Sequence, residues 1–347
     1  MSDRNNISSR KREHLKIAVS KNAKYQELTT GLENYRFVNS ALPEINFSDV
    51  CVATEFLGYN LSCPLIINPI SGGEKTGETL NRDLAKIAAR QKVALSLGSI
   101  RPALENTKTL ETYQVVVDHT KNVPLIGNIG CLQLKNLDNY DQIFSIFEKL
   151  QTDAISVHLN PLQEVLQPEG GTNFEGIIES LEKFINNSDL PVIVKEVGFG
   201  MSSQIIKKLV DIGCEWIDIS GSGGTNWARI EAERINNTED RVIAREFGEW
   251  GIPTAQSLIN AHEYKKSRLI ASGGLDSGIQ FAKALALGAD LGGIAGSVLR
   301  AWGENGTAGV DNLIEKYRKV LKICLFSTGI RNIQDFCYNS DIIKRIE

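Results

Sequence analysis

Residues 191–224 read PVIVKEVGFGMSSQIIKKLVDIGCEWIDISGSGG, and this stretch contains a complete strand–helix–strand pattern. The runs at 191–195 and 216–220 are short and mostly apolar, as strands buried on both faces of a parallel sheet are. Between them, Ser202 can cap an amphipathic helix that Gly213 can end. The stretch therefore predicts one strand–helix unit of a parallel α/β fold.

Short apolar runs of this kind recur along the chain, with amphipathic helical stretches between them. They lie at residues 64–68, 93–97, 124–128, 154–159, 191–195, 216–220, 268–272 and 291–295. Eight alternating units favour a closed (β/α)8 TIM barrel over an open doubly wound sheet. We expect one α/β domain over residues 1–347, with an N-terminal extension (1–60), the barrel (64–300) and a C-terminal helix and tail (310–347).

The composition narrows the class of protein. The chain has 347 residues, 42% of them hydrophobic and 23% charged, which is typical of a soluble globular protein. Its six cysteines include no C-x-x-C pair, and no secretory signal or membrane span is present, so we expect a cytoplasmic protein. Residues 1–30 carry a local charge of +4, which leaves −8 on the remainder. This pattern argues against nucleic acid as a partner and fits a small anionic substrate.

Small or reactive residues follow every predicted strand directly. The C-terminal ends of all strands of an α/β barrel open on one face, where the active site lies. After the seventh and eighth strands, Gly273, Gly274 and Gly296 let backbone N–H groups approach a phosphate, and the next helix adds its positive N-terminus. The sequence therefore predicts a phosphate site at this point.

Lys195 ends the fifth predicted strand. Strand alternation places it on the same side as Ile193, toward the barrel interior near its mouth. A lysine there is costly unless an anion or a polar ligand contacts it. We favour a ligand; the alternative is a structural ion pair with Glu196 or Asp218.

The end of the fourth predicted strand gathers several polar groups. His158 and Asn160 alternate onto one face, and Gln163 and Glu164 follow in the loop. A carboxylate such as Glu164 can share Mg²⁺ with phosphate oxygens. His158 considered alone could equally be a structural residue at the strand end.

A basic arm lies near the start of the chain. Arg10, Lys11 and His14 fall on one face of a predicted helix, where they could bind a diphosphate by several charge-assisted hydrogen bonds. The alternative is a solvated basic tail, which the spacing alone favours.

Several long motifs resemble one family. They are RKREHL (10–15), GNIG (127–130), HLNPLQEVLQPEG (158–170), PVIVKEVGFGMS (191–202), DISGSGGTNWARIEAER (218–234), WGIPTAQSL (250–258) and ASGGLDSG (271–278). Together they resemble type 2 isopentenyl diphosphate isomerase, an FMN-dependent enzyme. The resemblance covers nearly the whole chain and implies interconversion of isopentenyl diphosphate and dimethylallyl diphosphate in isoprenoid biosynthesis. It also implies Mg²⁺, NADPH as a reductant of the flavin, and a homo-oligomer, either a tetramer or an octamer.

The resemblance also implies roles for individual residues. The implied FMN contacts are Pro69, Ile70, Ser71, Ser99, Asn128, Lys195, Ser220, Thr225, Gly273, Gly274, Leu275, Ala295 and Gly296. The implied substrate contacts are Arg10, Lys11, His14, Ser99, Arg101, His158, Asn160 and Gln163, with Glu164 on Mg²⁺. The implied catalytic residues are Gln163, His158, Asn160 and Lys195, and either flavin N5 or Gln163 moves the proton.

The chain departs from the family pattern at a few positions, namely Ile70-Ser71, Ile100, Gly171 and Asp276. We expect the acidic side chain of Asp276 to repel the FMN phosphate, because many flavin barrels have a basic residue there. The insertion at 225–267, with Trp227 and Trp250, is a candidate lid over the site. Two other functions compete with the isomerase: an FMN-dependent 2-hydroxy-acid oxidase and a non-catalytic phosphate-binding barrel. The oxidase would need a histidine base beside the flavin at the barrel mouth. His119 and His262 fall in a loop and a helix, away from the strand ends.

Overall fold

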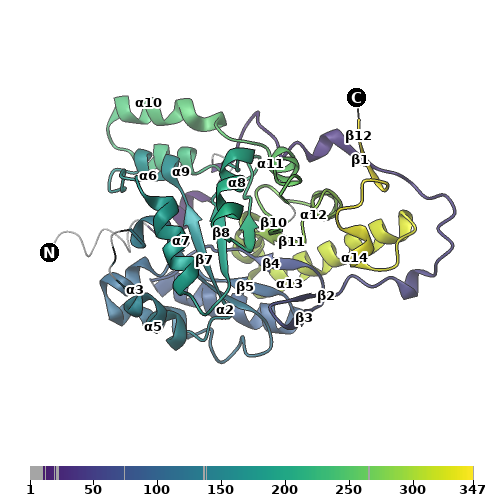
Figure 1. The fold of residues 1–347 in the computed structure, drawn as a ribbon, viewed down its shortest axis with the longest axis horizontal. Helices are drawn as coiled ribbons and strands as arrows, with labels where there is room; N and C mark the ends of the chain where they lie inside the picture. Colours follow the sequence, from purple (N-terminus) through teal and green to yellow (C-terminus); the bar gives the residue numbers. More distant parts are fainter. Residues whose placement is uncertain are drawn as a thin grey trace.

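The barrel is closed, as the strand pattern predicts (Figure 1). The computed structural model describes residues 11, 13–18, 20, 23–73, 75–135, 137, 139–264 and 266–346. Eight parallel strands pair in chain order around the ring, and the last pairs with the first. Their bounds are β4 (Leu65–Ile67), β5 (Ala94–Ser96), β6 (Leu125–Gly130), β7 (Ala154–Leu159), β8 (Val192–Glu196), β9 (Trp216–Asp218), β10 (Arg268–Ala271) and β11 (Leu291–Ile294). Every predicted strand is therefore confirmed to within about two residues at each end.

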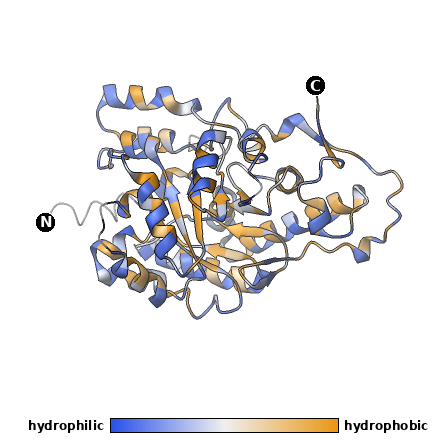
Figure 2. Ribbon diagram, viewed as in Figure 1, coloured by the Kyte–Doolittle hydropathy of each residue, from blue (hydrophilic) through white to orange (hydrophobic). Residues whose placement is uncertain are grey.

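Helices connect the strands and cover the outside of the ring. They are α2 (Lys75–Gln91), α3 (Arg101–Glu105), α4 (Glu111–Gln114), α5 (Asp141–Lys149), α6 (Pro161–Leu166), α7 (Ile177–Asn187), α8 (Ser203–Asp211), α9 (Trp227–Arg234), α10 (Thr238–Glu246), α11 (Thr254–Ala261), α12 (Gly278–Ala286) and α13 (Gly296–Ser327). The helix cap predicted at Ser202 is confirmed. The hydroxyl of Ser202 accepts a hydrogen bond from the N–H of Ile205 at the start of α8. Figure 2 shows hydrophobic residues concentrated on the strands and polar ones on the outer helices.

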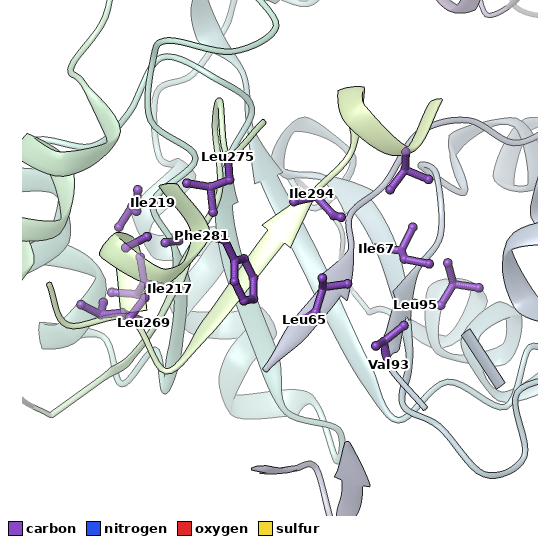
Figure 3. Close-up of a cluster of buried hydrophobic side chains, with 14 of the residues drawn as sticks. Leu65, Ile67, Val93, Leu95, Ile217, Ile219, Leu269, Leu275, Phe281 and Ile294 are labelled. Carbon is purple, nitrogen blue, oxygen red and sulfur yellow. The ribbon is translucent and has the colours of Figure 1, made fainter. Parts of the chain in front are cut away.

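Side chains on each strand alternate between the barrel interior and the layer under the helices. The interior cluster contains one or more residues from every strand, among them Ile66, Ile193 and Ile270. Their neighbours in sequence, such as Leu65 and Ile67, belong to the larger outer cluster, part of which Figure 3 shows with Phe281 of α12. Lys195, two residues after Ile193, is buried on the interior side as predicted.

A hairpin closes the end of the barrel opposite the strands' C-termini. Its strands are β2 (Thr54–Phe56) and β3 (Tyr59–Leu61). Phe56 and Leu61 join the interior cluster, and the ring of Phe56 meets that of Trp216 edge to face, with centroids 4.9 Å apart. Trp216 is the first residue of β9, so this plug seals the strand starts and leaves the other end open. No pattern in the sequence predicted this hairpin.

Two segments far apart in the sequence pair beside the barrel. β1 (Tyr35–Phe37) pairs antiparallel with β12 (Ile343–Arg345), and α14 (Ile333–Phe336) lies next to them, at the right of Figure 1. The predicted C-terminal helix at 310–326 belongs to α13, which begins at Gly296 and is interrupted by non-helical backbone at Asn305 and Gly306. None of the helices in the described part of the chain combines the length and apolar character needed to cross a membrane.

Candidate active site

One cavity of about 250 Å³ opens at the C-terminal ends of the strands. Residues that follow all eight barrel strands line it, which is the arrangement that the strand ends predicted. The predicted site residues within the described ranges all line this cavity: Lys11, His14, Pro69, Ile70, Ser71, Ser99, Arg101, Asn128, His158, Asn160, Gln163, Glu164, Lys195, Ser220, Thr225, Gly273, Gly274, Leu275, Ala295 and Gly296. Arg10 lies outside the described residues. His119 and His262, which the sequence places away from the strand ends, are not among the lining residues.

The glycines after β10 form the floor of one end of the cavity. Gly273 and Gly274 have positive φ angles of 95° and 72°. A Cβ atom on Gly273 would lie 1.9 Å from the carbonyl oxygen of Gly221, so only glycine fits here. In the same cavity, the buried hydroxyl of Ser71 has no hydrogen-bond partner among the described residues. The tightly turned backbone at Gly273 and Gly274, called the glycine seat below, and the unsatisfied hydroxyl of Ser71 fit a phosphorylated ligand such as FMN.

Lys195 projects into the base of the cavity. Its side chain is buried and donates a hydrogen bond to the backbone carbonyl of Glu196. The carboxylate of Glu196 accepts instead from the N–H groups of the loop at 198–200, and Asp218 accepts from Asn68 and Ser272. Lys195 therefore forms no close ion pair within the described part of the chain, although burial raises the pKa of Glu196 and Asp218 and the charge of Lys195 opposes that rise. A ligand contact for Lys195 stays a prediction.

His158 is partly buried, with positive charges around it. Burial and the charges of Lys195 and Lys11 lower its pKa to about 3. Its Nδ1 lies 3.0 Å from Oδ1 of Asn128, so the neutral imidazole donates there and presents Nε2 to other partners. The ring is thus held in one orientation by a neighbouring strand, in the uncharged form at neutral pH.

The polar residues after β7 form one network around α6. The Asn160 amide donates to Oε1 of Gln163 at 3.2 Å and to Oε1 of Glu164 at 3.0 Å. The N–H of Gly171 donates to the other oxygen of Glu164 at 2.7 Å. Glu164 is 8% exposed and forms no ion pair with any described residue. A buried carboxylate with only neutral donors fits a divalent cation that takes its remaining ligands from the substrate. Within the described ranges, no three His, Cys, Asp or Glu side chains gather around a common metal position.

Glu231 completes this network, and the sequence analysis missed it. The carboxylate is fully buried on α9. Its Oε1 accepts from Nε2 of Gln163 at 3.1 Å and lies 2.9 Å from Nε2 of His14, and its Oε2 accepts from Arg234 at 2.5 Å. Although burial would raise the pKa of Glu231, His14, Arg234 and Gln163 together lower it. The available signal was a glutamate on the same helical face as Ala228 and Ala232, where a buried apolar side chain is usual.

The N-terminal arm lies in the cavity mouth. Lys11 donates to the carbonyl oxygens of Gly72 at 2.6 Å and Ser99 at 3.2 Å and to the hydroxyl of Tyr113 at 3.2 Å. His14 packs edge to face on Trp227, with ring centroids 5.2 Å apart. These two members of the basic arm are therefore part of the site, and a freely solvated tail is wrong for them.

Trp227 and Trp250 of the candidate lid lie in different environments. Trp227 lines the cavity, whereas Trp250 is 61% exposed and is not among the lining residues. The insertion is folded as α9, α10 and α11, and Figure 1 shows α9 and α10 beside α6. Its role as a moving lid stays a prediction.

Asp276 does not act alone, contrary to the sequence expectation. Oδ1 accepts from Arg300 at 2.7 Å, and Oδ2 accepts from Lys24. Burial would raise the pKa of Asp276, but the two cations lower it, so it stays ionised. The cluster carries one net positive charge, and the expected repulsion of a phosphate is therefore offset.

Comparisons with known proteins agree with this geometry. The model of the FMN-dependent dehydrogenase family matches residues 163–344. An isopentenyl-diphosphate delta-isomerase from Nostoc sp. is 37% identical over all of this chain and 98% of its own length. Another, from Rickettsia canadensis, is 40% identical over 94% of this chain and 95% of its own.

Solved structures show the same fold at low identity. A flavocytochrome b2 variant with sulfite bound is 16% identical, covers 95% of this chain and 82% of its own, and has a TM-score of 0.68. A lactate oxidase from Pediococcus acidilactici is also 16% identical, with coverage of 97% and 94% and a TM-score of 0.66. By the near full-length similarity of its sequence relatives, the chain belongs to the FMN-dependent, type 2 family of isopentenyl-diphosphate delta-isomerases.

Proposed function

We propose that this protein interconverts isopentenyl diphosphate and dimethylallyl diphosphate, with reduced FMN and Mg²⁺. The observation that carries this proposal is the buried amide of Gln163. Glu231 fixes its nitrogen end and Asn160 its oxygen end, in the same cavity as the glycine seat for a phosphate. A neutral, rigidly oriented amide between a carboxylate and this cavity suits proton movement at an alkene better than hydride removal from an acid.

The nitrogen donors of the cavity mouth fit the substrate's diphosphate. Lys11, His14 and Arg101 converge there from the arm and from α3, and Glu164 would hold Mg²⁺ between itself and the diphosphate. The positive charges that lower the pKa of His158 are countered when the diphosphate binds. Binding therefore favours protonation of its Nε2, which can then donate to a phosphate oxygen.

The reaction protonates one alkene carbon and removes a proton from another. When bound, reduced FMN supplies an electron-rich surface that stabilises cationic character at the tertiary carbon. Lys195 places a buried positive charge at the base of the cavity and favours the anionic form of a nearby ring. Gln163 is our candidate for handling the proton, since the ionised carboxylate of Glu231 contacts it; flavin N5 is the competing position.

The other expectations from the family also belong to this proposal. NADPH would serve as the reductant, and the protein would be a cytoplasmic homo-oligomer, a tetramer or an octamer. Their support is the family resemblance alone. Light scattering on the purified protein measures the oligomer size directly.

An anaerobic assay tests the proposal. The purified protein with FMN, Mg²⁺ and isopentenyl diphosphate should form dimethylallyl diphosphate only after NADPH or dithionite bleaches the flavin. A parallel assay offers lactate to the oxidised protein and follows flavin bleaching. Turnover of isopentenyl diphosphate without any reductant would contradict the proposed role of the flavin, and bleaching by lactate would favour the oxidase.

A further inference from the structure

Three charged side chains form a wall beside the glycine seat. Asp276 follows Gly273-Gly274 in the loop after β10, Arg300 lies four residues after Gly296 on α13, and Lys24 comes from the N-terminal segment. Asp276 accepts hydrogen bonds from both cations, one on each carboxylate oxygen. All three line the same cavity as the glycines. Residues far apart in sequence thus meet at the predicted phosphate site.

The guanidinium of Arg300 lies close to Gly296, at the predicted phosphate site. Its NH2 atom is bonded to Asp276 at 2.7 Å, and its NH1 atom has no hydrogen bond among the described residues. A Cβ atom placed on Gly296 would lie 3.2 Å from Arg300 NH1 and 3.1 Å from Thr225 Oγ1. Because Gly296 has no Cβ, the space beside it is bounded by the Arg300 guanidinium and the Thr225 hydroxyl. Both groups can donate a hydrogen bond to a phosphate oxygen.

Lys24 is held at this wall by its backbone as well as by Asp276. Its backbone forms an isolated antiparallel β-bridge with that of Thr225, and the N–H of Tyr25 donates to the carbonyl of Gly224 at 3.4 Å. The segment therefore runs along the loop that follows β9. The Lys24 side chain is 35% exposed, that of Arg300 25% and that of Asp276 33%, so the wall is accessible from the cavity.

The charges of the wall favour an anion. Two cations and one carboxylate leave a single net positive charge, next to glycine N–H groups and the N-terminal ends of α12 and α13. We propose that Arg300 and Lys24 bind the terminal phosphate of FMN, and that Asp276 is a positioning residue that holds both cations in place. This assignment rests on the proposed use of FMN by the protein.

Riboflavin separates the phosphate contact from all other flavin contacts, because it is FMN without the phosphate. The apoprotein is titrated with FMN and with riboflavin, and the dissociation constants are read from quenching of flavin fluorescence. The variants are Arg300→Gln, Lys24→Gln and Asp276→Ala. The control is Lys207→Gln, which removes a cation from an exposed pair with Asp211 on α8.

Arg300→Gln should weaken FMN binding by about 10- to 100-fold, the usual effect of losing a hydrogen bond to a charged group. Lys24→Gln should weaken FMN binding by a smaller factor, because Lys24 is more exposed. Riboflavin binding should stay within about twofold in both, and this also shows that the variants are folded. Lys207→Gln should change neither constant.

Asp276→Ala distinguishes positioning from repulsion. A positioning role predicts weaker FMN binding, whereas a purely repulsive aspartate predicts tighter binding, which would overturn the role assigned to Asp276. If the wild-type protein prefers FMN over riboflavin and both cation variants keep that preference, the assignment of Arg300 and Lys24 is wrong while the proposed function stands. If the wild-type protein binds neither flavin, the proposed function fails first.

Discussion

Replacing Glu231 by Gln tests the network around the proposed proton-handling group. The side chain keeps its size, but a carboxylate that accepts on both oxygens becomes an amide with one acceptor and one donor. In the structure Oε1 accepts from Gln163 and Oε2 accepts from Arg234. The new amide can satisfy only one of them and presents its NH2 group to the other.

The size of the effect follows from these contacts. One hydrogen bond to a charged group is lost in a fully buried site, which costs about 1.5–3 kcal/mol. Arg234 remains paired with Glu169 at 2.7 Å, so it is not left without a partner. If the loss falls on the transition state, kcat/KM for isopentenyl diphosphate should drop by about 10- to 100-fold.

The assay is anaerobic turnover with dithionite-reduced FMN, together with FMN affinity and Tm for each variant. Glu169→Gln is the matched control, because it weakens the other anchor of Arg234 without touching Gln163. It should keep kcat/KM within about threefold. If Glu231→Gln retains the wild-type kcat/KM, or if the control loses as much, then Glu231 does not act through Gln163.

Three further predictions concern ionisable side chains of the site. Lys195→Met should lower the reduction potential of bound FMN by roughly 30–60 mV, because the reduced anion loses a buried cation. A spectroelectrochemical titration measures this potential, and an unchanged value would show that Lys195 does not interact with the flavin. Glu164→Gln should raise the Mg²⁺ concentration for half-maximal rate about tenfold or more, a loss of ~1.4 kcal/mol, and an unaltered Mg²⁺ titration would remove it as a ligand. The pKa of His158 is about 3 when folded and 6.5 as a reference, so the unfolded state takes up the proton first as pH falls. Relative to His158→Gln, the substrate-free wild type should therefore lose about 2 kcal/mol of unfolding free energy between pH 7.5 and pH 5.0 in denaturant titrations, and parallel pH profiles would contradict a neutral His158.

The barrel strands could be predicted from local sequence patterns. Each strand is short, apolar and followed by glycine or a polar residue, so its position and its open end can be recognised one unit at a time. Strand alternation then placed Lys195 beside Ile193 inside the barrel, which the structure confirms. The family motifs brought the remaining site residues together.

Features that depend on distant partners were missed. The hairpin of Phe56 and Leu61 consists of two three-residue strands, too short for a periodic signal. The pairing of Asp276 was not predicted, because the cation Lys24 lies 252 residues away in the chain. Glu231 was overlooked because its partners Gln163 and His14 come from two other segments, which only the folded chain brings close to α9. In each case the deciding interaction is absent from any local window of sequence.

The antiparallel pair of β1 and β12 has a consequence for how the molecule is made. Residues 35–37 find their partners only at 343–345, so during synthesis on the ribosome that pairing waits until α13 has emerged. Contacts of such large sequence separation form slowly, since a long loop must close first. The segment before β1, which carries Lys11 and His14, is anchored instead on the loop after β9 and on α9. The arm can therefore dock as soon as those elements have formed, whereas the pairing of β1 waits for the last residues of the chain.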